Sequence, residues 1–466
     1  MSDAERFERG DEPAIPIDCV DTESFAQYRE GLPPSVRAYV AAVGFEPKPG
    51  AILLAPSPDG ALARVIFGVD APGASGVDPF LAGKLAGLPA GSYALERAPS
   101  DPGAAALAFL LSSYQFLRYR SKPAEKPRLR APAGVDASRL ERIAAAVALG
   151  RDLINTPAND MGPQALTEAA LALAERHSAA ARAVVGEDLL GENFPLIHAV
   201  GRAAAQAPRL VEFSHGPADG LKVTLVGKGV CYDTGGLDIK PSSAMALMKK
   251  DMGGAAVTIA LAEMLLSADL PLRLRVILPI VENSVSAASF RTGDVYKSRK
   301  GLTVEIGNTD AEGRLILADA LALASEDEPD LLFDFATLTG AARVALGPEV
   351  PPFYTCSDTL ADEIARAGAK ANDPVWRLPL WQGYQSGLDS KIADVSSTTS
   401  HGFAGSITAA LFLGRFVAQP ERWAHFDVYC WNPSAKPGRP EGGEIQAARL
   451  LYDLIEARLA AGREGR

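Results

Sequence analysis

The second half of the chain alternates between apolar runs of strand character and longer runs of helical character. The strand-like runs are residues 222–227 (KVTLVG), 272–283 (LRLRVILPIVEN), 302–307 (LTVEIG) and 331–338 (LLFDFATL). Helices are predicted between them at residues 253–266 (GGAAVTIALAEMLL) and 315–325 (LILADALALAS). Strands that alternate with helices over short connections form right-handed crossovers. The pattern therefore predicts an α/β fold whose larger part is a mainly parallel sheet, covered by helices on both faces.

The first 130 or so residues predict a smaller α/β domain. Strand-like runs at residues 51–57 and 63–70 are separated by turns rich in glycine and proline, and residues 104–120 favour a helix. A proline-rich, basic stretch at 121–134 is typical of a linker, and Asp136 is an N-cap candidate for the helix that follows. We therefore predict an N-terminal α/β domain at 1–135, a connecting helix at 136–160 and a larger domain at 161–466.

Composition narrows the possible functions. The 466 residues exceed the usual size of one domain, and 47% apolar with 22% charged residues is ordinary for a globular protein. A net charge of -11 disfavours nucleic-acid and anionic-membrane partners, so small molecules or peptides fit better. The four cysteines show no CxxC spacing, the N-terminus lacks a secretory signal, and no long apolar stretch predicts a membrane span. We expect a cytoplasmic protein without disulfides.

Two stretches concentrate charge where strands end. "NTDAEGR" (308–314) carries Asp310 and Glu312 just before an apolar helix. The glycine-rich stretch at 226–254 offers two lysines and two aspartates, namely Lys228, Lys240, Asp233 and Asp251. Ligands of parallel sheets bind beyond the carboxyl ends of the strands. Carboxylates that converge there repel one another unless a cation sits among them, so the residues predict two divalent ions, with one lysine as a neutral nitrogen ligand.

Each feature also has an ordinary structural interpretation. An isolated DxE is usually a solvated turn, and Lys-Lys-Asp at 249–251 is typical of a charged surface. The glycine-rich loop lacks the order of residues that a phosphate-binding loop requires. The histidines form no HExxH or HxxxH pair, so His425, in an apolar stretch, is expected in the core. Cys231 is expected to pack beside the site.

The two stretches together carry a resemblance. "VGKGVCYDTGGLDIKPSSAMALMKKDMGGAA" and "GDVYKSRKGLTVEIGNTDAEGRLILADALA" resemble the leucyl aminopeptidase (cytosol aminopeptidase) family of two-metal peptidases. The likeness continues through residues 336–347, 376–397 and 405–417, and covers the chain from about 150 to 430. It implies that the domain at 161–466 is catalytic and that the protein hydrolyses the N-terminal residue of peptides.

The resemblance also assigns metal ligands. It implies a tighter metal site formed by Lys228, Asp233, Asp251 and Glu312, and a more exchangeable site formed by Asp233, Asp310 and Glu312. Asp233 and Glu312 would then bridge the two ions, with a water or hydroxide between them. Carboxylate oxygens with one nitrogen suit several divalent ions, of which we expect Mn or Zn.

Two further positions are implied to act on the reaction without binding metal. Lys240 would stabilise the oxyanion as a cation. Arg314 is always protonated and cannot serve as a base, so the resemblance implies that it holds a bicarbonate ion that moves the proton. Because one metal would bind the free α-amine, peptide substrates need a free N-terminus.

The pocket for the N-terminal side chain is expected to be apolar. Met248, Thr337 and Gly340 match family positions that line it. Tyr429 falls where the family has a small residue, so its ring either reduces the pocket or packs against the neighbouring helix. An inward ring predicts preference for short side chains such as alanine.

Two other classes of function stay open at this point. A metallo-amidase acting on non-peptide amides would keep the metals and change the pocket. A non-catalytic DNA-binding or scaffolding oligomer is disfavoured by the net negative charge of the chain. It is also disfavoured because all seven positions that match the family's catalytic site are retained. The resemblance also implies a homo-hexamer.

Overall fold

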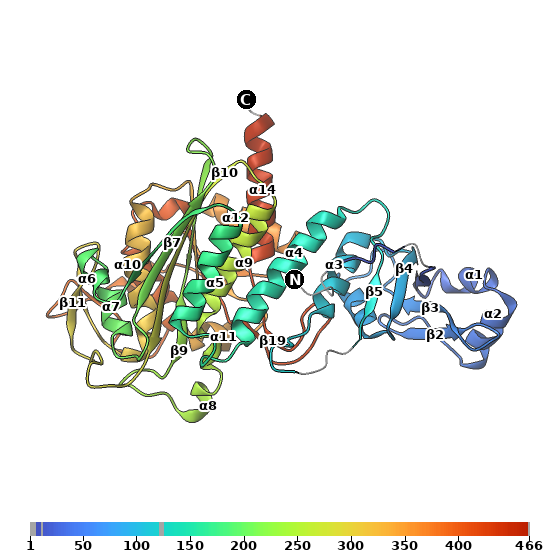
Figure 1. Ribbon diagram of the computed structural model, residues 1–466, viewed down its shortest axis with the longest axis horizontal. Helices are drawn as coiled ribbons and strands as arrows, with labels where there is room; N and C mark the ends of the chain where they lie inside the picture. The colour runs from blue at the N-terminus through green and yellow to red at the C-terminus, as the bar shows by residue number, and fades with distance from the viewer. Residues whose placement is uncertain (1–5, 11–12, 121–124, 465–466) are drawn as a thin grey trace. The chain divides into compact units, whose positions relative to one another are not determined.

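A computed structural model describes residues 6–10, 13–120 and 125–464. The chain divides into two compact units, each described here by itself (Figure 1). The first comprises Met1–Ala148 with Ser434–Glu441, and the second comprises Leu149–Pro433 with Gly442–Arg466. The division falls within helix α4 (Ala137–Asn155), where Asp136 Oδ1 accepts a hydrogen bond from the backbone N–H of Arg139 at 2.9 Å. The helix therefore has the predicted N-cap.

The first unit contains a five-stranded sheet in the order β2-β3-β1-β4-β5. Its strands are β1 (Ile15–Val20), β2 (Ile52–Pro56), β3 (Leu62–Gly68), β4 (Gly91–Arg97) and β5 (Pro127–Leu129). Its helices are α1 (Phe25–Glu30), α2 (Pro34–Ala42) and α3 (Pro102–Ser113). The β2–β3 pair is antiparallel and the other pairs are parallel, so the small α/β fold is confirmed.

Two local predictions for this unit are wrong. The helix expected to reach residue 120 ends at Ser113, because Tyr114 takes extended backbone (ψ 139°) and the aromatic residues beyond it are poor helix formers. The segment read as a linker contains β5, which pairs with β4 and so belongs to the sheet. Residues 121–124 of that segment lie outside the described residues.

The second unit is organised around a nine-stranded mixed sheet. The order is β15-β14-β17-β13-β8-β10-β7-β6, and β9 pairs with β10. The strands are β6 (Ala180–Val185), β7 (Arg209–His215), β8 (Leu221–Gly227), β9 (Gly229–Asp233), β10 (Leu272–Asn283), β13 (Leu331–Ala336), β14 (Pro352–Tyr354), β15 (Trp376–Arg377) and β17 (Trp423–Asp427). The central strands β17, β13, β8 and β10 run parallel, while β6, β7 and β14 join by antiparallel pairs. The predicted α/β class is confirmed.

Helices cover both faces of this sheet (Figure 1). One face carries α7 (Pro195–Gly201), α10 (Glu312–Ser325) and α13 (Gly405–Gly414), and α10 contacts both of the others. The other carries α5 (Pro163–Arg176), α9 (Gly253–Ser267), α12 (Asp358–Lys370) and α14 (Ala448–Glu464). The remaining helices are α6 (Asp188–Gly191), α8 (Ser242–Met245) and α11 (Gly340–Leu346). None of the helices within the described residues has both the length and the apolar character that crossing a bilayer requires.

One predicted strand lies in a different sheet. Residues 302–307 contain β12 (Thr303–Glu305), which pairs with β11 (Val295–Lys297) and β16 (Val395–Ser396) in a small separate sheet. A second small sheet pairs β18 (Trp431–Asn432) with β19 (Gly442–Gly443). The acidic stretch after residue 307 therefore does not follow a strand of the main sheet. It reaches the site because helix α10 begins there.

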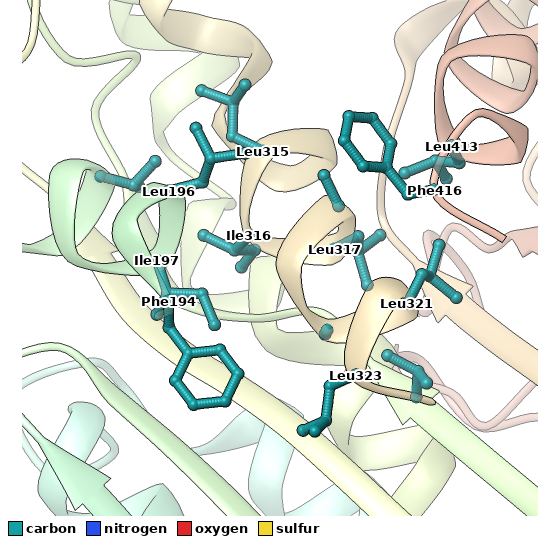
Figure 2. Close-up of a cluster of buried hydrophobic side chains, with 14 of the residues drawn as sticks. Phe194, Leu196, Ile197, Leu315, Ile316, Leu317, Leu321, Leu323, Leu413 and Phe416 are labelled. Carbon is teal, nitrogen blue, oxygen red and sulfur yellow. The ribbon is translucent and has the colours of Figure 1, made fainter. Parts of the chain in front are cut away.

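Helix α10 is buried on all sides, which fixes the position of its N-terminus. Figure 2 shows Leu315, Ile316 and Leu317 among the apolar side chains that extend from the helix toward α7 on one side and α13 on the other. Every residue from Glu312 to Ser325 is buried. A helix that is packed all round has little freedom to move, so the polar groups of its first turn are held rigidly.

Candidate metal centre

The ends of the central strands converge with the start of α10 around one cavity of about 450 Å³. All eleven residues that the sequence analysis singled out line it: Lys228, Asp233, Lys240, Met248, Asp251, Asp310, Glu312, Arg314, Thr337, Gly340 and Tyr429. Strands β8, β9, β13 and β17, the 3₁₀ segments η3 (Met248–Met252) and η4 (Thr309–Ala311), α10 and α11 supply them or the loops that carry them. The structure thus gathers residues that are up to 200 positions apart along the chain.

Lys228 occupies the turn between β8 and β9 and points to the middle of the acidic group. Its Nζ lies 2.8 Å from Asp251 Oδ2 and 3.0 Å from Glu312 Oε1, and donates to the carbonyl of Thr337 at 2.9 Å. A Cβ on Gly313 would stand 2.6 Å from Lys228 Cε, so only glycine lets the lysine pass this close to α10. Burial lowers the pKa of the Lys228 ammonium, but Asp251 and Glu312 outweigh burial and raise it.

Asp233 ends strand β9 and is held by three donors. Its Oδ1 accepts from the backbone N–H of Gly235 at 2.9 Å and from Asn283 Nδ2 at 2.8 Å, and its Oδ2 lies 2.8 Å from Lys240 Nζ. Gly235 and Gly236 take positive φ values of 87° and 67°, which turn the chain back toward Lys240. Lys240 also contacts Asp310, so it spans two of the carboxylates.

The carboxylates are buried and close enough together to shift one another's pKa values. Burial, with the nearby charge of Asp233, raises the pKa of Glu312 to about 8. Burial and the charge of Asp251 raise the pKa of Asp233 to about 6. Asp251 differs, because the ammonium groups of Lys228 and Lys250 outweigh its burial and lower its pKa. Bringing these acids together in ionised form requires additional positive charge.

The arrangement meets the requirements of a divalent cation. Asp233, Asp310 and Glu312 each offer a carboxylate oxygen, and these atoms lie within 4.8 Å of one another. Oε2 of Glu312 is buried and has no hydrogen-bond partner within the described residues, although a buried carboxylate oxygen is costly to leave unpaired. Hard oxygen donors at this spacing suit Mn²⁺, Zn²⁺ or Mg²⁺. The residues present therefore fit a metal centre.

Arg314 lies one turn further along α10. Its Nη1 donates to the carbonyl of Ser397 at 2.6 Å, and its Nε has no partner among the described residues. Burial lowers the pKa of the guanidinium to about 10, which still leaves it charged at neutral pH. A buried cation with a free donor beside the carboxylates is suited to binding an anion.

Four residues at the site were not singled out from the sequence. Asn283, at the end of β10, donates to Asp233 and to the carbonyl of Thr309. Asp427, at the end of β17, accepts from the backbone N–H groups of Leu338 and Thr339 and holds the loop after β13. Lys250 and Arg343 line the cavity beside Tyr429. Asn283 and Asp427 end long apolar runs, which is the only local signal that could have found them.

The structure also places residues 249–251, His425 and Cys231, for which the sequence predicts ordinary structural roles. The surface interpretation of residues 249–251 is wrong for Lys250 and Asp251, which are both 3% exposed. His425 lies in the core as expected, fully buried, with Nδ1 2.6 Å from Asp334 Oδ1. Cys231 is buried in β9, two residues before Asp233, and burial raises the pKa of its thiol.

Comparison with known proteins agrees with this geometry. Residues 148–452 match the sequence profile of the cytosol aminopeptidase family, catalytic domain, and residues 15–132 match that of the M17 aminopeptidase N-terminal domain. The chain belongs to the cytosol aminopeptidase family. Members of this family are metal-dependent aminopeptidases, so the predicted family, fold and enzyme class are confirmed.

Individual relatives match most of the chain, and two solved structures match nearly all of it. A probable cytosol aminopeptidase of Syntrophotalea carbinolica is 41% identical over 365 residues, which are 74% of this chain and 73% of that protein. The crystal structure of a cytosol aminopeptidase from Coxiella burnetii is 42% identical, covers 98% of this chain and 100% of its own, and superimposes with a TM-score of 0.92. The bottromycin maturation enzyme BotP in complex with Mn is 34% identical, covers 96% and 100%, and has a TM-score of 0.85.

Proposed function

We propose that the protein uses two divalent ions to release the N-terminal residue from peptides that have a free α-amine. The observation that carries the proposal is the cluster of three carboxylate oxygens within 4.8 Å, with Lys228 and Asp251 next to it. Lys228, Asp233, Asp251 and Glu312 would hold one ion. Asp233, Asp310 and Glu312 would hold the other. The relative solved with Mn supports manganese, and Zn is the alternative.

When bound, the ions would supply a hydroxide near neutral pH, a polarised scissile carbonyl and an anchor for the free α-amine. Their charge would also replace the proton on Lys228, which the carboxylates alone keep bound, so that Nζ can serve as a nitrogen ligand. Thr337 supports this arrangement, because its carbonyl accepts from Lys228 and its Oγ1 donates to Asp251 Oδ1 at 2.8 Å.

Two cations would act on the reacting groups. Lys240, 14% exposed at its side chain and facing the cavity, would stabilise the oxyanion that forms at the scissile carbonyl. Arg314 would hold a bicarbonate ion through its Nε, which has no partner in the described part of the chain, and this anion would carry the proton from the nucleophile to the leaving amine. Arg314 itself stays protonated throughout.

The requirement for a free amine separates this proposal from a metallo-amidase. An amino-acid amide and its N-acetylated form differ only at the α-amine, and we expect hydrolysis of the first and at least a hundredfold slower hydrolysis of the second, measured as kcat/KM. Equal rates on both would reject the aminopeptidase and favour the amidase.

Size selectivity should depend on Tyr429. The ring is half-buried and lines the cavity with Met248 and Thr337. Because each excluded methylene of a substrate is worth about 1–3 kcal/mol in discrimination, we expect the wild-type enzyme to favour alanine over leucine and phenylalanine amides. Tyr429→Ala should restore the bulky substrates. A wild-type enzyme that prefers leucine, with no broadening in the variant, would contradict this.

We also propose a cytoplasmic homo-hexamer. Large apolar side chains of the second unit are exposed, among them Val344 (87%), Phe403 (79%) and Ile392 (66%). Exposed apolar side chains on this scale are typical of surfaces that another copy covers. The relatives are named cytosol aminopeptidases, which supports a cytoplasmic location. Light scattering coupled to gel filtration should give the mass of a hexamer, whereas the mass of a single 48.9 kDa chain would contradict the proposal.

A further inference from the structure

The wall of the cavity beside the metal centre carries two cationic side chains that metal binding does not require. Lys250, in η3, is 3% exposed, and its Nζ lies 4.6 Å from the centroid of the Tyr429 ring. The guanidinium of Arg343, in α11, lies 4.7 Å from the same centroid. All three residues line the cavity. Two positive charges therefore lie against the same aromatic ring, which we call the aromatic wall.

No carboxylate in the described part of the chain forms an ion pair with either cation, within 4 Å. Asp427 also lines the cavity, but its oxygens accept from Leu338 N, Thr339 N and Oγ1, and Ser406 Oγ. The cost of leaving a buried charge unpaired applies to Lys250, whereas Arg343 is an exposed side chain. The cations therefore have capacity to bind an anionic group that enters the cavity.

The two cations stand in the part of the cavity expected to receive the N-terminal side chain. A Cβ on Gly340 would lie 3.6 Å from Arg343 Nη2, and Gly340, with Met248 and Thr337, is one of the positions predicted to line that pocket. The guanidinium thus reaches the space that a substrate side chain would fill. The sequence predicts an apolar pocket, but the structure places a cation in its wall.

The aromatic wall is held in place from behind. The backbone N–H groups of Tyr429 and Cys430 both donate to Gln446 Oε1, at 2.9 and 3.0 Å. Cys430 takes a φ of 58°, a left-handed conformation that is unfavourable for a residue with a side chain. A strained backbone persists only where its surroundings hold it, so the segment that carries the Tyr429 ring is fixed at the cavity wall.

We propose that this surface binds the side-chain carboxylate of an acidic N-terminal residue, so that the enzyme preferentially releases aspartate and glutamate. The inference rests on the proposed aminopeptidase function and names its substrate class. Arg343 offers a planar pair of donors that matches a carboxylate, and it stays charged at any pH at which the enzyme works. Lys250 adds a second donor from the buried side of the ring. Aspartate, the shorter of the two acidic side chains, is the better fit to the limited room beside Tyr429.

The test compares substrates that have the same shape and differ in charge. Glutamyl and glutaminyl aminomethylcoumarin are nearly isosteric, as are the aspartyl and asparaginyl pair, and alanyl aminomethylcoumarin reports the aminopeptidase activity itself. A hydrogen bond to a charged group is worth about 1.5–3 kcal/mol, so we expect kcat/KM for the acidic member of each pair to be about tenfold higher or more.

Variants assign the preference to the two cations. Arg343→Gln and Lys250→Met should each lower the glutamyl-to-glutaminyl ratio of kcat/KM about tenfold. Arg343→Glu should invert the ratio. Arg366→Gln, an exposed arginine of α12, is the matched control and should leave the ratio at the wild-type value. Arg343 is exposed, so its variants test the inference even where Lys250→Met does not fold.

The outcomes distinguish this inference from the proposed function. No hydrolysis of any of these substrates by metal-loaded enzyme would reject the proposed function. Hydrolysis of the alanyl substrate with equal rates on glutamyl and glutaminyl substrates would reject the inference alone. A carboxylate could also come from the C-terminus of a dipeptide. Faster cleavage of Ala-Ala than of Ala-Ala amide, together with a glutamyl-to-glutaminyl ratio of kcat/KM near one, would show that the cations bind the C-terminal carboxylate. That result would overturn the assignment to the side chain.

Discussion

Glu312→Ala should lose bound metal and turnover together. Glu312 contributes to both proposed metal sites, and its Oε1 lies 3.0 Å from Lys228 Nζ, so its removal takes away a bridging ligand and leaves the lysine short of a counter-charge. Loss of an outer-shell partner typically costs about 10–100-fold in metal affinity or activity. Loss of a direct ligand should exceed that. Asp251→Ala, which removes a ligand from one site only, should also lose metal and turnover.

The readouts for these variants are metal content per chain, turnover on an alanine amide and the circular dichroism spectrum. Asp362→Ala, at an exposed position of α12, is the control for loss of a carboxylate remote from the site. Glu312→Gln keeps the shape of the side chain while removing its charge, and should resemble Glu312→Ala. A folded Glu312→Ala enzyme that retains wild-type turnover would show that Glu312 is not a ligand.

Lys240→Ala should lower kcat by roughly two orders of magnitude or more while the metal content stays unchanged. This is the scale expected for loss of one donor to a developing oxyanion. Lys240 is suited to the role because Asp233 and Glu312 outweigh its burial and raise its pKa, so the side chain stays a cation. Burial acts in the opposite direction, because a side chain that is only 14% exposed has lost most of its water.

The division of the effect between kcat and KM decides the role of Lys240. A group that acts only in the transition state lowers kcat and kcat/KM alike. Lys391→Ala, at an exposed position outside the cavity, is the matched control. A change in KM alone for Lys240→Ala would show that the lysine holds substrate and does not stabilise the oxyanion.

Elements with strong periodicity could be predicted from the sequence. Strand β10 begins and ends where its apolar run does, at Leu272 and Asn283, and α10 contains the predicted 315–325. Pairing partners could not be predicted in the same way. Strand β12 pairs with β16, about 90 residues further along the chain, and nothing in its own three residues distinguishes a small sheet from the large one.

The motifs are long enough to bring the expected acidic and pocket positions to one cavity, whereas the two cations of the pocket, Lys250 and Arg343, could not be predicted. The charged neighbours of Lys250 in the sequence predict a surface position for it. In the fold, its ammonium lies over the ring of Tyr429, which is about 180 positions away along the chain and comes near only through the order of strands in the sheet. Likewise, Asp427 supports the loop after β13 only because β17 and β13 are neighbours.

The most direct test of the central claim is removal of metal followed by its return, monitored by release of the N-terminal residue from a peptide. The enzyme stripped by a chelator and verified to be metal-free should release no free amino acid. Addition of Mn²⁺ or Zn²⁺ should restore release in proportion to the metal bound, approaching two ions per chain. Full activity in the verified metal-free protein would contradict the account, because the cavity offers carboxylates for a metal and the proposed reaction has no other source of its nucleophile.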